Sequence, residues 1–311
     1  MKKLLLLSIF AFFALVSANV FGQNAGTPLN PSMGDIRTYS VASHLGSTYS
    51  WTLQTTADGS GTDLFVAAAI ASATGTSSSS VTVTWLAPVV PTIYYLHLTE
   101  TNATCSNRKV LAIQPVNNFK LEIVNVDAVG TPLIAGLATN NPTCAPAIAS
   151  TMIWNGTGSV TTTNATDFKY DYGTTTYYYK ITATGINFSN TEWTPSITIA
   201  QLNGTNASVT IDTKVGTADW VTPSIILTSA NGTFTPLIPA GVGNSEILVK
   251  VTVKNNIGTP ATANENLSDN TYTITLNAAS KDENNNPATS LGNGNTVQTQ
   301  LARPASGFIT Y

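Results

Sequence analysis

Short runs in which apolar and polar residues alternate are the feature that most limits the fold of this chain. They span Val81–Trp85, Tyr177–Ala183, Glu246–Lys254 and Tyr272–Leu276. Successive residues of a β-strand point to opposite faces of a sheet, so each run has one apolar and one polar face. The pattern predicts half-buried antiparallel strands.

The segments between these runs favour turns over helices. Asn-Gly pairs, which tolerate positive φ, recur at 155–156, 203–204, 231–232 and 293–294. The Ala-rich stretch Leu64–Ala73 is the best candidate for a short helix, and we interpret it as a strand. Many short strands without alternating helices predict an all-β chain of two tandem antiparallel β-sandwiches of the Ig/PKD-like type.

The N-terminus predicts export. A Lys-Lys start precedes the apolar run Leu4–Val16, which is shorter than the roughly 20 residues that a membrane-spanning helix needs. We therefore interpret residues 1–22 as a signal peptide, with Gln23 as the mature N-terminus. Cleavage after Ala18 and a retained N-terminal anchor are the alternatives. No later stretch is apolar enough to predict a membrane span.

Charge and length limit the partners and the domain count. Removal of the signal peptide leaves 11 basic and 16 acidic residues, a net charge of −5, which argues against nucleic-acid binding. The remaining 289 residues suffice for two domains. A break near Pro115–Asn118 predicts one sandwich at 23–116 and a second, larger one at 117–311.

Residues 27–115 contain short motifs in a fixed order: Gly34, Tyr39–Val41, Tyr49–Trp51, Val81–Trp85, Leu98–Asn102 and Cys105. This order resembles the PKD-like, immunoglobulin-type domains in surface proteins of Gram-negative bacteria that use type IX secretion. Unlike the better-known form of the family, the chain has Thr52-Leu53 after the tryptophan. The resemblance implies that Trp51 is a core residue on a central strand. It also implies a stalk, spacer or adhesive module at the cell surface, without catalysis.

Few residues are suited to chemistry. The histidines are His44, predicted to lie in a loop, and His97, predicted to be an ordinary sheet residue. There is no Gly-x-Ser-x-Gly elbow and no zinc-binding histidine pair, so we predict no catalytic residues and no cofactor. The oxygen-rich loops around Asp58, Asp63 and Asp282 are weak calcium candidates, and plain turns are the alternative.

Two further predictions concern aromatic residues and cysteines. Five aromatic residues of the second unit are weak candidates for a carbohydrate-binding platform, against the alternative that they fill the core or cover a sheet. They are Trp154, Tyr170, Tyr172, Tyr178 and Trp193. Cys105 and Cys144 are a disulfide candidate because an exported chain meets oxidising conditions. The alternative is two buried free thiols.

The sequence therefore predicts a secreted, non-catalytic structural or adhesive protein of a Gram-negative cell surface. Its expected partners are other surface proteins, further copies of itself and polysaccharide. Free edge strands, or an extended segment such as Gln23–Met33 or Thr296–Tyr311, would allow self-assembly by strand addition. A carbohydrate-binding module is the main alternative, and a secreted hydrolase is a weaker one.

Overall fold

The computed structural model describes most of the chain and confirms the predicted fold class. The described residues are 26–133, 143–144, 152–154, 168–171, 174–203, 208–221, 226–227, 231–254, 257–258, 270–292 and 295–301. Almost all of their regular structure is β, and the pairings between strands are antiparallel with one exception. No helix in these ranges is long and apolar enough to cross a membrane.

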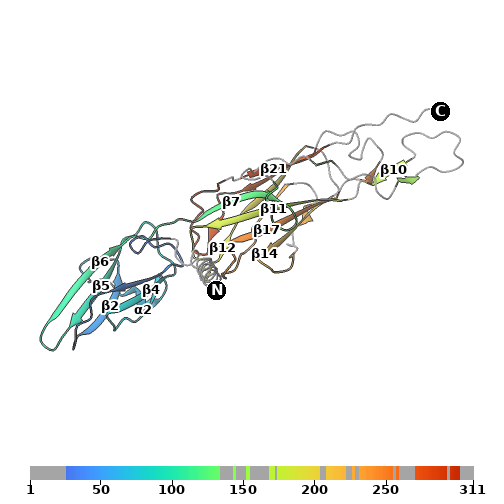
Figure 1. The fold of residues 1–311 in the computed structure, drawn as a ribbon. Helices are drawn as coiled ribbons and strands as arrows, with labels where there is room; N and C mark the ends of the chain where they lie inside the picture. The colour runs from blue at the N-terminus through green and yellow to red at the C-terminus, as the bar shows by residue number, and fades with distance from the viewer. Residues whose placement is uncertain are drawn as a thin grey trace, which may run out of the picture.

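The first unit is a sandwich of two three-stranded sheets (Figure 1). One sheet has the order β1-β4-β3, with β1 Ile36–Ser40, β4 Ser80–Trp85 and β3 Ala71–Thr74. The other has the order β2-β5-β6, with β2 Thr48–Gln54, β5 Tyr94–Thr101 and β6 Ser106–Ile113. The inward residues of β4, Val81, Val83 and Trp85, are fully buried, as their alternation predicts.

Two details of the first unit differ from the sequence predictions. Leu64–Ala67 forms a single helical turn, α2, and β3 follows it. The strand interpretation of this stretch was wrong at its start, because Asp63 caps the backbone N–H of Phe65 and so initiates a helix. Trp51 is buried as expected, but β2 lies at the edge of its sheet and not at the centre.

The second unit packs two five-stranded sheets against each other, giving a larger core. The first has the order β15-β14-β17-β11-β7: Ile226–Leu227, Ser208–Val215, Glu246–Lys254, Thr174–Thr184 and Lys120–Val126. The second has the order β16-β13-β19-β21-β8: Asn231–Phe234, Ile197–Asn203, Asn270–Leu276, Asn295–Leu301 and Thr143–Cys144. β8 runs parallel to β21.

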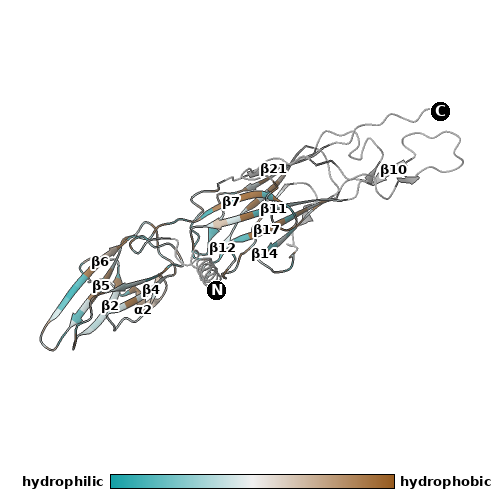
Figure 2. Ribbon diagram, in the orientation of Figure 1, coloured by the Kyte–Doolittle hydropathy of each residue, from teal (hydrophilic) through white to brown (hydrophobic). Residues whose placement is uncertain are grey.

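Smaller sheets complete the second unit. β12 (Trp193–Thr194) pairs with β20 (Lys281–Asp282) beside the first unit, and β9 (Met152–Trp154), β10 (Phe168–Asp171) and β18 (Ile257–Gly258) form a separate sheet. Hydropathy colouring shows hydrophobic residues concentrated on the central strands of the second unit (Figure 2). Strand β6 is hydrophobic at one end and hydrophilic toward its tip (Figure 2).

Candidate functional site

The segment that precedes β1 joins the two units. Met33 is 4% exposed and belongs to the hydrophobic core of the second unit, although it precedes the first strand of the first unit. The backbone N–H of Asn187 donates to the carbonyl of Met33 at 3.2 Å. The first unit therefore contributes a side chain to the core of its neighbour.

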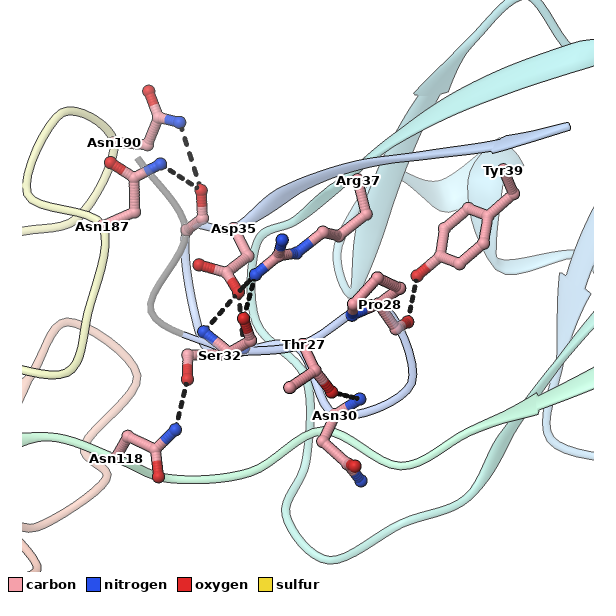
Figure 3. Close-up of polar contacts among 12 residues, drawn as sticks. Thr27, Pro28, Asn30, Ser32, Asp35, Arg37, Tyr39, Asn118, Asn187 and Asn190 are labelled. Carbon is pink, nitrogen blue, oxygen red and sulfur yellow. Dashed lines mark hydrogen bonds and ion pairs between the residues drawn. The ribbon is translucent and has the colours of Figure 1, made fainter. Parts of the chain in front are cut away.

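The next residue, Gly34, is held by two asparagine side chains (Figure 3). Its carbonyl accepts from Nδ2 of Asn187 at 2.8 Å and from Nδ2 of Asn190 at 3.3 Å. Gly34 has φ +76°, and a Cβ here would lie 2.3 Å from Oγ1 of Thr191. This close approach requires glycine.

Asp35 fixes the shape of the same segment from inside the first unit. Its Oδ2 accepts from the backbone N–H groups of Gly26 and Ser32 at 2.9 and 3.0 Å, and it pairs with Arg37 at 3.0 Å (Figure 3). Arg37 also donates to the carbonyl of Gly26. The segment is thereby tied to β1 before it reaches the second unit.

Two further asparagines bridge the units at their other contacts. Nδ2 of Asn118 donates to Oγ of Ser32 at 3.1 Å, beside Asn117, whose Nδ2 binds the carbonyl of Pro287 within the second unit at 2.8 Å. Nδ2 of Asn284, in the turn after β20, donates to the carbonyl of Leu86 at 2.9 Å. Backbone carbonyls thus accept most of these asparagine bonds, and together with Met33 they fix the two sandwiches to each other.

An apolar groove opens between β1 and β6, on the side of the first sandwich where its two sheets are not closed. Its volume is about 260 Å³, and its lining is mainly apolar, including Tyr39, Val41, Trp51, Leu96, Leu98 and Leu111. Burial raises the pKa of Tyr39 to about 12, and its hydroxyl donates to the carbonyl of Pro28 at 2.7 Å (Figure 3). The hydroxyl group of this groove residue is therefore bound to the 26–33 segment.

Of the five aromatic candidates, Trp193 and Tyr178 have described side chains, and these two do not lie on one common surface. Trp193 is a core residue: it is fully buried, lies edge-on to Phe119 with ring centroids 6.4 Å apart, and donates Nε1–H to the carbonyl of Asn244 at 2.8 Å. The prediction that it binds carbohydrate was wrong, because its short strand faces inward. The side chains of Trp154 and Tyr170, and all of Tyr172, lie outside the described residues.

Tyr178 is partly exposed, on the face opposite to the buried Tyr177 and Tyr179. It lies against Trp220, with ring centroids 6.0 Å apart, and Nζ of Lys250 lies 5.0 Å from the centroid of the same indole. Lys250 also pairs with Asp212 at 2.5 Å. Sequence reasoning missed Trp220, because it lies in the loop after β14 and follows no alternating pattern.

The three calcium candidates are engaged in local hydrogen bonds. Asp58 accepts from the backbone N–H of Ser60 at 3.0 Å, which lowers the pKa of Asp58, and Asp63 accepts from Leu53 at 3.0 Å. Asp282 is 3% exposed and accepts from the backbone N–H groups of Asn284 and Asn286; burial raises its pKa. Within the described ranges, no three His, Cys, Asp or Glu side chains meet as a metal-binding group.

The proposed disulfide is not formed in the structure. Cys105 is a free, exposed thiol in the turn between β5 and β6, which lies at the end of the first unit away from the second (Figure 1). Cys144 belongs to β8, in a sheet of the second unit, and its side chain is outside the described residues. A disulfide requires Cα atoms within about 7 Å, which this separation of elements does not provide.

The two histidines lie in different surroundings. His97 is 2% exposed on the outer face of β5, where Nε2 bonds the carbonyl of Thr56 at 3.0 Å and Nδ1 accepts from Arg108 at 2.8 Å. It is a sheet histidine, as predicted. His44 is exposed in a loop, and its Nδ1 lies 2.7 Å from Glu100, a hydrogen bond that lowers the pKa of that carboxyl.

Comparisons with known proteins give a fold-level likeness only. No protein-family model and no curated protein matches the chain. Among solved structures, titin domains Z1Z2 in complex with telethonin match at 9% identity and a TM-score of 0.37, covering 88% of this chain and 91% of that one. Zebrafish RET cadherin-like domains 1 to 4 match at 11% identity and a TM-score of 0.23, covering 88% of this chain and 47% of that one.

An endo-fucoidan hydrolase of glycoside hydrolase family 107 also matches, at 12% identity and a TM-score of 0.20, covering 89% of this chain and 33% of that one. At TM-scores below 0.5, none of these matches says what this chain binds or does.

Proposed function

We propose that the chain is an exported, non-catalytic structural or adhesive element at the surface of a Gram-negative bacterium. The observation that carries the proposal is the junction. Met33 lies in the second core, and Asn187, Asn190 and Asn284 bind carbonyls of the first unit, so two sandwiches are fixed end to end. A connected pair of sandwiches suits a spacer or stalk, and the signal-like residues 1–22 support export.

The proposal is tested by location and by activity together. Protease treatment of intact cells should release peptides of this protein, while a periplasmic control protein stays protected. A variant that lacks residues 1–22 should stay inside the cell. Purified protein should show no turnover of polysaccharide, peptide or ester substrates. A periplasm-only location, or hydrolysis abolished by one carboxylate substitution, would contradict the proposal.

Carbohydrate binding is the second candidate function, and the pair formed by Tyr178 and Trp220 favours it. Both rings are partly exposed, and Lys250 and Asp212 supply polar groups beside them. Sugars stack on such rings while polar neighbours bind their hydroxyl groups. If this function holds, Trp220→Ala should abolish retention on an insoluble polysaccharide, whereas Tyr95→Ala, another partly exposed tyrosine, should not.

A further inference from the structure

The edge of strand β6 is open along most of its length. Seven of its eight residues are exposed, and only Ile113 is buried. Val110 and Leu111 are 45% and 38% exposed. Among the described strands, β6 pairs only with β5.

The ladder shows which backbone groups face the open edge. The turn bond from the N–H of Asn102 to the carbonyl of Cys105 sets the register. Alternate residues of an antiparallel strand bond to the same neighbour, so Lys109 and Leu111 bond to β5. Arg108, Val110 and Ala112 therefore direct their N–H and carbonyl groups outward.

The chain's own N-terminal segment begins to cover this edge and then leaves it. The N–H groups of Gln114 and Val116, which continue the outward set, donate to the carbonyls of Leu29 and Pro31 at 2.9 and 3.0 Å. The turn at 27–30 directs the start of this segment away from the edge, to Asp35, which accepts from the N–H of Gly26. Among the described residues, this segment therefore covers only the end of the edge, next to residues 114–116.

We propose that this groove and edge accept residues 305–311 of a second copy of the chain as an added β-strand. The inference rests on the proposed structural function and names the surface through which copies assemble. Parts of the two segments named from the sequence already have places in the fold: residues 26–33 pack at the junction, and 295–301 form β21, which leaves the residues after 301 as the candidate. A β-hairpin from a second copy would bring its turn against Leu29 and Pro31, which already bind the backbone just after β6. A single extended segment avoids this contact and therefore fits better.

Residues 302–311 suit the site in their pattern. Pro304 has no N–H to donate, so residues 305–311 are the part of this segment that can pair along the edge positions 106–112. In an extended segment Ile309 and Tyr311 share one face, which suits the apolar floor formed by Trp51, Leu96 and Leu111. The segment contains no acidic residue.

The donor must come from another molecule. β21 runs away from the first unit (Figure 1) and ends at Leu301. Ten extended residues reach at most about 35 Å. Returning along the seven residues of β21 and then along the seven edge positions requires about 45 Å at 3.3 Å per residue. Donation to the next copy is head-to-tail, which produces open chains of molecules, or rings where the rotation between copies closes.

The test combines size measurement with peptide binding. The full chain should form concentration-dependent oligomers by light scattering, and a variant lacking 302–311 should stay monomeric. A labelled peptide of residues 302–311 should bind that variant. Val110→Pro removes an outward N–H without touching the β5 ladder and should weaken peptide binding about tenfold, whereas Val110→Thr keeps the N–H and should bind normally.

A peptide carrying Ile309→Asp gives a test that cannot disturb folding of the acceptor, and it should bind at least tenfold more weakly. Oligomers that persist without 302–311, a peptide that fails to bind, or equal binding by Val110→Pro would each overturn the inference. A monomeric full chain that is still found on the cell surface without turnover would end this inference and leave the proposed function standing.

Discussion

The two sandwiches differ in how completely strands close their cores. In the second unit, Ile247, Val249, Val251 and Val253 of the central strand β17 are fully buried between two five-stranded sheets. In the first unit, three strands face three, and β6 has no described neighbour on its outer edge. The comparison shows that the apolar face of a strand is fully buried where a second sheet covers it and a neighbouring strand lies on each side of it.

A matched pair of tryptophans gives the largest test of this contrast. Trp193→Ala should lower the free energy of unfolding by about 3–5 kcal/mol, because it removes a fully buried ring. Trp51→Ala should cost clearly less, because Trp51 lines the open groove, where water enters in place of a void. Urea unfolding of both variants, with the partly exposed Trp220→Ala as control, measures the difference. Equal losses for Trp193 and Trp51 would remove the contrast.

Truncation of Met33 tests whether this residue, which precedes the first strand of the first unit, stabilises the core of the second unit. Met33→Ala should destabilise the second unit by about 2–3 kcal/mol, because its side chain belongs to that core. The change should appear in the unfolding signal of Trp193, not in that of Trp51. Leu45→Ala, at a fully exposed position of the first unit, is the control. Loss confined to the first unit would contradict the assignment of Met33.

Asn187→Ala tests the polar side of the junction. It removes the 2.8 Å donor to the buried carbonyl of Gly34 and leaves only the longer bond from Asn190. We expect a loss of about 1–3 kcal/mol. Small-angle scattering should also report a wider range of shapes. Asn190→Ala serves as the comparison and should cost less, since its bond is longer and its residue exposed.

The smallest effect on stability is expected at the hydrogen bond between His44 and Glu100, in the first unit. The hydrogen bond from His44 lowers the pKa of Glu100 below its usual 4.5. A lowered pKa in the folded state contributes stability that is present above about pH 4.5 and is lost as the pH falls below it. Melting temperatures of wild type and Glu100→Gln should therefore differ slightly at pH 6 and converge near pH 3. A difference that grows toward pH 3 would contradict this sign.

The fold class was predictable because alternation is local, and β17 and β19 follow it residue by residue. Features that depend on distant partners were not. Nothing local marks Met33 as part of the second core or Trp220 as the neighbour of Tyr178. Trp193 was misassigned because a two-residue strand carries too little periodicity to show which face it buries.

Met33 has a practical consequence for anyone who cuts or recombines this protein. A fragment that starts at the break near residue 117 would lack Met33, and the missing side chain would leave a hole in its core. Conversely, the first unit expressed by itself would expose that methionine to solvent. The sequence break lies near residue 117, after the first sandwich, but the second core already includes Met33, which precedes the first sandwich. The two sandwiches should therefore be transplanted together.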